Sequence, residues 1–444
     1  MTRTARPTAA GALALGLLTL APPQAEAAAE IQRVVSPGGI EAWLVEEPAI
    51  PMVAMELSFE GGASLDPEAL PGVANFLAGM LEEGAGDLDA VAFAESAQLL
   101  GARFSFDAGR DGFRVSARML SEAKQESVEL LRLALADPRF DAEPMERVRA
   151  QILSGIRSDE ADPRALARDA FWSRAFPDDP YGRPVDGTLG SVGAIAPDDL
   201  EAARERLLNV DAVKIGVVGD IDAETLGPLL DDLLGELPRA APPERGETDF
   251  EKPGGVRVVP FDAPQSTVMF GHAGPLRDDE DFIPLYVLNY ILGGGGFSSR
   301  LTEEIREKRG LAYSAYSYLL PLDRAGLWIG GVGTANERVS ESLEVIRAEW
   351  RRMAEEGVTE DELRKAKQYL TGAYPLRFDS NASIASILVG LQEAGLGRDY
   401  PEIRNDLIEA VTREDVARVA EDWMNPDALA FVVVGRPTGV DATQ

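Results

Sequence analysis

The sequence contains no cysteine and a single histidine, His272, among its 444 residues. A chain without thiols can form neither a disulfide nor a thiolate metal site. With only one imidazole as well, it cannot assemble the nitrogen- or sulfur-rich ligand set that an ordinary zinc site needs. His272 stands where a strand is expected to end, and a hydrogen-bonded structural role fits it better than a catalytic one.

Positive charge is also scarce, because 43 Lys and Arg face 75 Asp and Glu, for a formal net charge of −32 at pH 7. A chain of that sign is a poor partner for nucleic acid, whose phosphate backbone binds cationic side chains. It would attract basic partners at long range, but a solvated acidic surface that aids solubility explains the charge more simply. We therefore expect no nucleic-acid partner.

Long apolar runs are absent after the N-terminal stretch of the sequence. Arg3 and Arg6 precede an apolar stretch at residues 9–21, and a small-residue cleavage site follows at residues 25–27. This pattern predicts a secretory signal peptide over residues 1–27, since the apolar stretch is too short to span a bilayer as a mature helix. Export of a cysteine-free chain suits a bacterial periplasm, and we expect no membrane span in the mature chain.

The two halves of the chain repeat one another. Residues 199–219 match residues 415–435, and both segments run through a helix, a turn and a strand that ends in glycine. The positions that recur identically are Asp199, Glu205, Asn209, Asp211, Ala212, Val217, Val218 and Gly219. A second, shorter match lies upstream, where residues 151–155 resemble residues 368–372. The number of positions between the two matching segments is nearly the same as for the first match. The match predicts a duplicated unit of ordinary domain size.

The repeat defines the expected fold. We predict an α+β protein with two duplicated domains, each a mixed, mostly antiparallel sheet packed with helices. The N-terminal domain would cover residues 28–240 and the C-terminal domain residues 253–444, joined by a Pro-rich, charged linker at residues 241–252. A cleft between such domains is the default ligand site.

The most informative stretch of the chain is residues 292–318. Four glycines end an apolar segment there, and a short helix is expected to follow, with Ser298 or Ser299 as its N-cap and Gly310 just past its end. Leu301 and Ile305 are four residues apart and would form the buried stripe of that helix. No Gly-Lys-Ser/Thr follows the glycines, so the run is not a phosphate-binding loop, and a tight turn between two helices would explain it.

Two side chains of chemical interest flank the end of this helix. Arg306 lies one residue off the buried stripe, and Tyr313 lies just past Gly310, where Leu311, Tyr313 and Ala315 would alternate as in a strand. A guanidinium on a helix and a phenol on the next strand can converge at one end of a sheet. The alternative is that Arg306 pairs with a neighbouring glutamate, Glu303 or Glu307, and that Tyr313 is a half-buried strand residue.

The whole mature chain resembles one half of the pitrilysin/insulinase-type peptidases, the inverzincins. The resemblance rests on the duplicated plan, on residues 61–67 and 72–81 at the opening of the first domain, and on the motifs of the second domain. Those motifs are the glycines at 293–296, Ser299-Arg300-Leu301, Arg306-Glu307-Lys308 and Gly310-Leu311-Ala312-Tyr313.

The chain departs from this family where active members bind zinc. Active members carry His-x-x-Glu-His, in which the histidines bind the metal and the glutamate is the general base. The corresponding positions here are Asn75, Ala78 and Gly79, and residues 147–154, where a third ligand is expected, contain no carboxylate. The resemblance therefore implies no metal in this chain and no peptide hydrolysis by the chain alone.

Some members of the family divide the active site between two similar chains, and this chain is similar to the zinc-less, alpha-type subunit of processing peptidases. The resemblance implies catalytic roles for Arg306 and Tyr313. A phenol can donate to the oxyanion of the tetrahedral intermediate, and a guanidinium can hold substrate carbonyl or carboxylate groups. It also implies a substrate-binding loop, made of Gly293, Gly294, Gly295, Gly296 and Phe297.

The same resemblance implies a partner and a substrate. The partner would be a homologous subunit that bears His-x-x-Glu-His and the zinc, and the substrate a peptide or unfolded polypeptide. Two alternatives remain open: a structural or peptide-binding scaffold with no catalytic role, and a peptidase with an oxygen-only metal site. Such a site would be built from acidic clusters, namely Glu82, Glu83, Asp159, Glu160 and Asp162.

Overall fold

The computed structural model describes residues 30–240, 245–250, 254–440 and 442–443. The predicted signal peptide lies outside the described residues, as do parts of the predicted linker. Among the residues that are described, no helix combines the length and the apolar character needed to cross a membrane.

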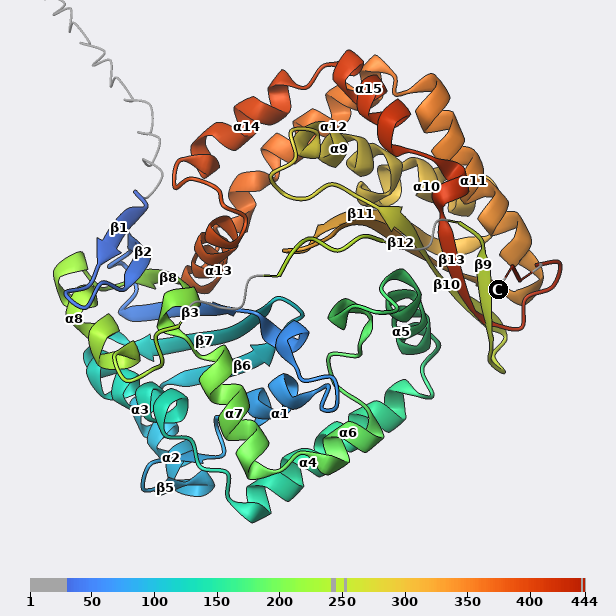
Figure 1. Ribbon diagram of the computed structural model, residues 1–444. Helices are drawn as coiled ribbons and strands as arrows, with labels where there is room; N and C mark the ends of the chain where they lie inside the picture. Colours follow the sequence, from blue (N-terminus) through green and yellow to red (C-terminus); the bar gives the residue numbers. More distant parts are fainter. Residues whose placement is uncertain (1–29, 241–244, 251–253, 441, 444) are drawn as a thin grey trace, which may run out of the picture.

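Each half of the chain is built around one mixed sheet, as the repeat predicts (Figure 1). The N-terminal sheet has the order β1-β2-β8-β3-β7-β6, with strands β1 Gln32–Val35, β2 Glu41–Glu46, β3 Met52–Glu60, β6 Arg103–Ala108, β7 Gly112–Leu120 and β8 Val213–Gly219. The C-terminal sheet has the order β11-β12-β10-β13-β9, with strands β9 Val256–Pro260, β10 Gln265–Ala273, β11 Ala312–Pro321, β12 Gly326–Ala335 and β13 Ala430–Gly435. A short hairpin of β4 Gly84–Ala85 and β5 Leu88–Asp89 stands apart from both sheets.

The two sheets correspond strand by strand once β1 is set aside. Strands β2, β8, β3, β7 and β6 take the places of β9, β13, β10, β12 and β11. The one parallel pair occupies the same position in each sheet, β2 with β8 and β13 with β9, and the other pairs are antiparallel. The expected duplication and the α+β class are therefore confirmed, and β6 and β11 are equivalent edge strands.

Helices pack on the sheets and bury a separate core in each half. Those of the first half are α1 Val73–Met80, α2 Ala90–Leu100, α3 Lys124–Ala136, α4 Ala142–Asp159, α5 Pro163–Ala175, α6 Leu189–Ala194, α7 Pro197–Leu207 and α8 Ala223–Leu234. Those of the second half are α9 Phe282–Asn289, α10 Arg300–Thr302, α11 Val339–Glu356, α12 Glu360–Gly372, α13 Asn381–Glu393, α14 Tyr400–Ala410 and α15 Arg413–Trp423.

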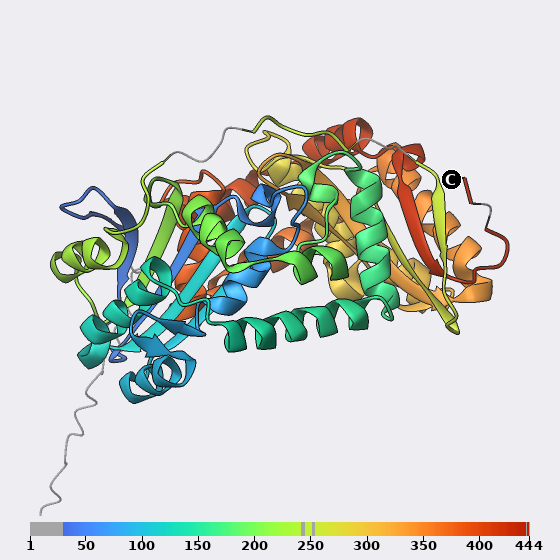
Figure 2. The ribbon, with the colours of Figure 1, turned by 60° about the horizontal axis from the view of Figure 1, so that its bottom comes forward.

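One helix from each half packs against the sheet of the other half. Helix α5 places Phe171 and Trp172 in an apolar cluster with Leu327, Ile329 and other residues of the C-terminal sheet. Helix α13 places Leu388 in a second cluster with strand residues of the N-terminal sheet. Figures 1 and 2 show both crossings, with α5 against β10 and β13 and α13 against β8. This exchange joins the two halves through apolar burial.

A cluster of polar residues, which we call the polar latch, also joins the halves. It consists of Asp111, Asp179, Tyr181 and Arg324. The fully buried Tyr181 donates its hydroxyl hydrogen to Asp111 Oδ1 at 2.6 Å and accepts from the backbone N–H of Arg324 at 3.2 Å. Arg324, in the turn between β11 and β12, also pairs with Asp179 at 2.6 Å. The turn of the second sheet is thereby fixed to loops of the first half.

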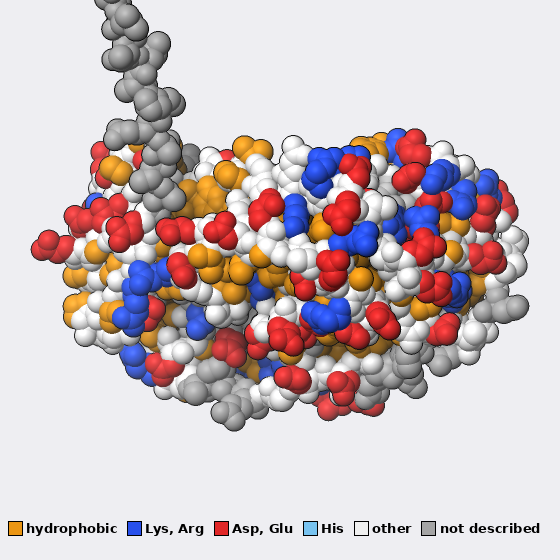
Figure 3. Space-filling view, turned by 90° about the horizontal axis from the view of Figure 1, so that it is seen from above, with side chains coloured by type: hydrophobic (Ala, Val, Ile, Leu, Met, Phe, Trp, Pro, Cys, Tyr) orange, Lys and Arg blue, Asp and Glu red, His pale blue; other side chains and the backbone are white. Residues whose placement is uncertain are grey.

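The negative charge of the chain is not gathered in one patch on the face seen in Figure 3, where acidic and basic side chains are interspersed. That distribution fits the solvated acidic surface expected from the composition.

Candidate functional site

The glycine run connects α9 to α10, as the tight-turn interpretation predicts, but it does so through unusual helical turns. Helix α9 continues into a π-helix at Tyr290–Gly294 and then a 3₁₀ turn at Gly296–Ser298. Gly293 lies so close to β11 that a Cβ atom there would approach Ser317 Oγ to 2.3 Å. Any larger residue would separate the helix from the strand, which explains a glycine at this position.

The helix expected between Ser299 and Gly310 is present, but most of it is not α-helical. Ser299 is its N-cap, Gly310 adopts the expected positive φ of 59°, and Leu301 and Ile305 are fully buried. After the short α10, Glu303–Glu307 form a π-helix in which the Lys308 N–H donates to the Glu303 carbonyl at 2.9 Å. Such wide turns are rare and are frequent at functional sites.

The predicted alternation of Leu311, Tyr313 and Ala315 is wrong. Leu311 and Ala315 are buried at 4% and 3% exposure, whereas the Tyr313 side chain is 76% exposed. The pairing of β11 with β12 shifts register between Ala312 and Ala315, which is a β-bulge. A bulge re-aims the side chain that it carries, and here it turns the Tyr313 ring away from the sheet.

Arg306, Tyr313 and Phe297 meet at one place. The guanidinium carbon of Arg306 lies 4.6 Å from the ring centroid of Tyr313 and 4.6 Å from that of Phe297. Both rings are largely exposed, at 76% and 71%, while the Arg306 side chain is 28% exposed. A planar guanidinium between two aromatic faces is favoured by its charge and its shape. The structure therefore brings one residue of the predicted loop against the predicted Arg/Tyr pair.

Arg306 retains hydrogen-bonding capacity in this position. Its Nε pairs with Glu307 at 3.3 Å, so one of the two ion pairs in the alternative interpretation forms. Its Nη1 is buried and finds no hydrogen-bond partner within the described part of the chain. The other glutamate, Glu303, pairs with Lys308 instead, and Tyr313 is exposed rather than half-buried.

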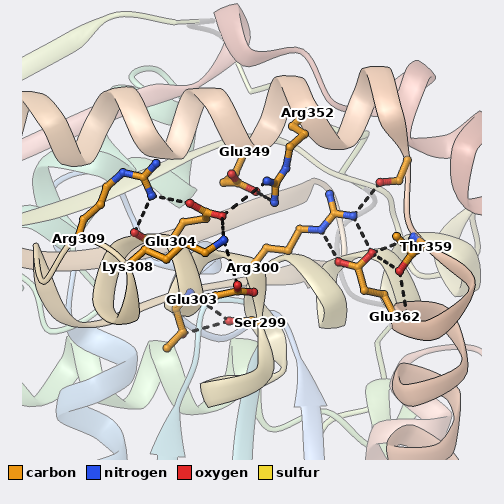
Figure 4. Close-up of polar contacts among 12 residues, drawn as sticks. Ser299, Arg300, Glu303, Glu304, Lys308, Arg309, Glu349, Arg352, Thr359 and Glu362 are labelled. Carbon is orange, nitrogen blue, oxygen red and sulfur yellow. Dashed lines mark hydrogen bonds and ion pairs between the residues drawn. The ribbon is translucent and has the colours of Figure 1, made fainter.

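A network of charged side chains fixes the turn that carries Arg306 to α11 (Figure 4). The buried carboxylate of Glu304 accepts from Lys308 at 2.7 Å and from Arg309 at 2.5 Å, and Arg352 of α11 lies 3.6 Å away. Burial alone would raise the pKa of Glu304, but the hydrogen bonds from Lys308 and Arg309 hold that pKa below its usual value. Arg352 also pairs with Glu349 at 2.7 Å.

A second ion pair fixes the start of the same segment. Arg300 is buried and donates through two nitrogens to the Glu362 carboxylate at 2.6 and 2.8 Å. Burial opposes ionisation of Glu362, but the Arg300 guanidinium and the Thr359 cap lower its pKa to about 2. The forked contact ties α10 to the N-terminus of α12.

One further supporting residue, Asn289, is missing from the sequence-based set of site residues. Its buried Oδ1 accepts from the Ser317 hydroxyl and from the Trp328 indole N–H, both at 2.8 Å. It thereby holds β11 and β12 against the end of α9. Its position four residues before Gly293, the first residue of the glycine run, is the one signal in the sequence that could have identified it.

The degenerate zinc positions lie on α1 in the other half of the chain, away from α10 (Figure 1). Ala78 is buried, and a Cβ on Gly79 would come within 2.9 Å of Val148 Cγ1 on α4. Only Asn75 offers a polar side chain, and one amide is no zinc site. Within the described ranges, no three His, Cys, Asp or Glu are placed to hold a metal ion. The residues here do not fit the zinc of active inverzincins.

The acidic residues considered for an oxygen-only metal site make other contacts, among them ion pairs with arginine. Glu83 pairs with Arg147, and Asp159 pairs with Arg168 at 3.0 Å. Burial, with the neighbouring Glu83 charge, raises the pKa of Glu82. These residues contribute to surface ion pairs and helix ends.

Comparison with known proteins identifies related chains over almost the whole described length. Residues 42–189 match the family described as Insulinase (Peptidase family M16), and residues 194–370 match the one described as Peptidase M16 inactive domain. These matches confirm the resemblance on which the residue assignments rest.

Two of the similar curated proteins differ in what their names say about activity. The "Non-peptidase homolog YmxG" of Helicobacter pylori is 26% identical over 390 residues, which cover 88% of this chain and 90% of that protein. An uncharacterized zinc protease of Streptomyces coelicolor is 28% identical over 408 residues, which cover 88% of this chain and 87% of that protein.

Among solved structures, a peptidase M16 inactive domain from Pseudomonas fluorescens superposes with a TM-score of 0.86 at 29% identity, covering 93% of this chain and 98% of that one. A protease from Helicobacter pylori superposes with a TM-score of 0.83 at 18% identity, covering 92% and 100%, and supports the fold alone.

Proposed function

This chain belongs to peptidase family M16, the insulinase family, and from that premise we propose that it is the zinc-less subunit of a two-chain peptidase. Its partner would be a homologous chain that bears His-x-x-Glu-His and supplies both zinc and general base. This chain would supply Arg306 and Tyr313 from its C-terminal half and part of the wall around a peptide or unfolded polypeptide. The predicted signal peptide places the pair in the bacterial periplasm in this proposal.

One observation supports the proposal above all. Arg306 and Tyr313 converge, while the positions that bind zinc in active family members carry no metal-binding side chains in this chain. The Arg306 guanidinium is held 4.6 Å from the Tyr313 ring, and the Arg306 side chain stays 28% exposed. Asn75, Ala78 and Gly79 cannot bind zinc. In this proposal the metal therefore comes from the partner chain.

The chemistry assigned to the pair follows from what each group can donate. The Tyr313 hydroxyl is on a largely exposed ring, so it is free to donate to a substrate oxyanion. Removal of one such donor typically lowers kcat about 10²- to 10³-fold. The guanidinium, already held in one plane by two rings, can bind a substrate carbonyl or carboxylate with little loss of conformational freedom.

The test is reconstitution from two purified chains. We expect hydrolysis of an unfolded fluorogenic peptide only when this chain is mixed with its His-x-x-Glu-His homologue. Tyr313→Phe should lower kcat about 100-fold without changing the size of the complex in light scattering. Tyr316→Phe is the matched control, because Tyr316 lies on the same strand and is also exposed, at 50%.

Two outcomes would overturn the proposal in different ways. Chelator-sensitive hydrolysis by this chain alone would show that it binds its own metal. Equal activity of Tyr313→Phe, Arg306→Ala and wild type in the complex would remove the Arg/Tyr role and leave a structural or peptide-binding scaffold.

A further inference from the structure

A pocket lies in the C-terminal half, between α9, α13 and α14, and is not part of the Arg306 site. Its volume is about 610 Å³, within the range that holds a small organic ligand. Helix α13 contributes Ile387 and Leu391 to its lining, and α9 contributes Ile283. The lining also includes four aromatic residues and three arginines but one carboxylate, which is unusual in a chain with a net charge of −32.

Arg277 contacts two aromatic rings in this pocket. Its guanidinium carbon lies 4.3 Å from the ring centroid of Phe282 on α9 and 5.3 Å from that of Tyr400 on α14. One of its terminal nitrogens donates to the Tyr400 hydroxyl at 2.8 Å. These contacts fix the orientation of the guanidinium without neutralising its charge.

Arg404 lies one turn after Tyr400 on α14 and, like Arg277, contacts two aromatic rings. It lies 4.1 Å from the ring of Tyr374 and 5.8 Å from that of Tyr286, which follows Phe282 by one turn of α9. Arg404 is only 6% exposed, and its hydrogen bonds are to the Leu370 carbonyl and to the neutral Asn405 side chain. A guanidinium buried to this degree is normally paired with a carboxylate.

No carboxylate within the described residues forms an ion pair with Arg277 or Arg404. The ion pairs of the chain involve many other arginines but neither of these two. The one acidic residue in the lining, Asp379, is exposed at the rim together with Arg377. By contrast, the neighbouring 830 Å³ cavity between the two halves is lined by more acidic residues than basic ones, with Glu60, Asp323 and Glu393 among the acidic group. Arg277 lines both spaces, but among the residues lining the α9–α13–α14 pocket the arginines outnumber the carboxylates three to one.

We propose that this pocket binds a small organic carboxylate with an apolar chain. Arg277 and Arg404 would hold the carboxylate, because a guanidinium binds that group with two parallel hydrogen bonds. The apolar chain would lie along Ile283, Ile387 and Leu391. Because α13 also packs on the sheet of the N-terminal half, an occupied pocket would fix one of the two helices that join the halves. The inference is independent of the proposed peptidase role.

Sodium octanoate is the probe, titrated into the full chain by isothermal calorimetry, with octanamide as its uncharged counterpart. We expect octanoate to bind at least tenfold more tightly than octanamide. Acetyl-Leu-Phe as free acid and as amide forms a second arm. Binding by octanoate alone identifies a fatty acid as the source of the carboxylate, and tighter binding by the peptide acid identifies a peptide C-terminus.

Variants locate the binding within the pocket. Arg277→Gln should weaken octanoate binding at least tenfold, and Ile387→Trp should abolish it by filling the apolar end. Arg398→Gln is the matched control, since Arg398 is exposed and donates to the Ile31 carbonyl outside the pocket, and it should change affinity less than twofold. Circular dichroism verifies that each variant is folded. Equal affinity for octanoate and octanamide, absence of binding by both acids, or an unchanged affinity in Arg277→Gln would overturn the proposal.

Discussion

The guanidinium carbon of Arg306 lies 4.6 Å from the centre of the Tyr313 ring, although the two residues belong to different elements, a π-helix and a bulged strand. Each irregularity has a part in this contact. The bulge turns Tyr313 out of the sheet, and the wide turn carries Arg306 beside it. Phe297, from the segment after the glycine run, closes the other face of the guanidinium at 4.6 Å.

This stacking predicts that Arg306 cannot be replaced by lysine. Arg306→Lys keeps the charge but loses the planar group that lies between two rings and forks toward a carboxylate. Partner-dependent kcat/KM should fall roughly tenfold or more, which corresponds to about 1.4 kcal/mol. The free energy of unfolding of this chain should change by less than about 1 kcal/mol, because the two rings that Arg306 contacts are largely exposed. Wild-type kinetics in the lysine variant would contradict the requirement for a planar cation.

The charged network around Glu304 predicts that replacing either of two adjacent glutamates lowers the free energy of unfolding by different amounts. Glu304→Gln removes a buried carboxylate that accepts from Lys308 and Arg309, so the unfolding free energy should fall by about 2 kcal/mol. Glu303→Gln, the control, removes a carboxylate that is 57% exposed and, among the described residues, forms its ion pair with Lys308. It should cost less than about 0.5 kcal/mol. Urea denaturation measures both, and equal losses would contradict a supporting role specific to Glu304.

Several features of the fold and site follow from the sequence because the residues responsible are close together in the chain. The duplication is visible since helix, turn, strand and terminal glycine keep the same spacing in both halves. The limits of the Arg306 helix are visible because Ser299 and Gly310 have strong local preferences. The family resemblance, confirmed by the comparisons, could be stated on short motifs for the same reason.

The remaining features depend on contacts between distant residues. The predicted alternation of Leu311, Tyr313 and Ala315 is wrong because the bulge is set by pairing with β12, which no local pattern encodes. Glu362 contacts Arg300 across 62 positions of sequence. The exchange of α5 and α13 between the halves likewise depends on which apolar faces meet in the folded chain. The roles of Arg306, Tyr313 and the glycine loop in catalysis stay predictions.

The latch between the halves predicts a pH-dependent effect of Tyr181→Phe. Burial raises the pKa of Asp111, and the hydrogen bond from the Tyr181 hydroxyl counteracts that rise. Without the hydroxyl, the ionised carboxylate loses its donor, so the pKa of Asp111 should rise further and the variant should lose stability as pH increases. We expect a cost of about 1 to 3 kcal/mol at pH 8 and a smaller cost at pH 4, where Asp111 is protonated to a greater extent.

Denaturation of wild type and Tyr181→Phe at both pH values measures this dependence. Tyr374→Phe is the control, because Tyr374 is also buried but its hydroxyl has no hydrogen-bond partner among the described residues. A cost for Tyr181→Phe that is independent of pH would show that the lost hydrogen bond does not act through Asp111.

The single histidine provides the sharpest test of the C-terminal core. His272 accepts the Trp350 indole N–H at Nε2, at 2.9 Å, so its proton is on Nδ1, which lies 2.6 Å from the Ala273 carbonyl. Burial lowers the pKa of His272 to about 4, against the smaller opposing effect of the Ala273 carbonyl. Protonation of Nε2 would break the bond to Trp350 and place an uncompensated charge in the core.

The consequence is a defined pH window for stability. An unfolded chain binds this proton near pH 6.5 and the folded chain only near pH 4, so the contribution of neutral His272 is present above pH 6.5 and is lost as pH falls toward 4. The loss is on the order of 3 kcal/mol. Because the chain has one histidine, its C2 proton is the only such imidazole resonance and needs no assignment. That resonance should not shift between pH 8 and 5.5, and a titration midpoint near 6.5 would contradict the buried, neutral tautomer.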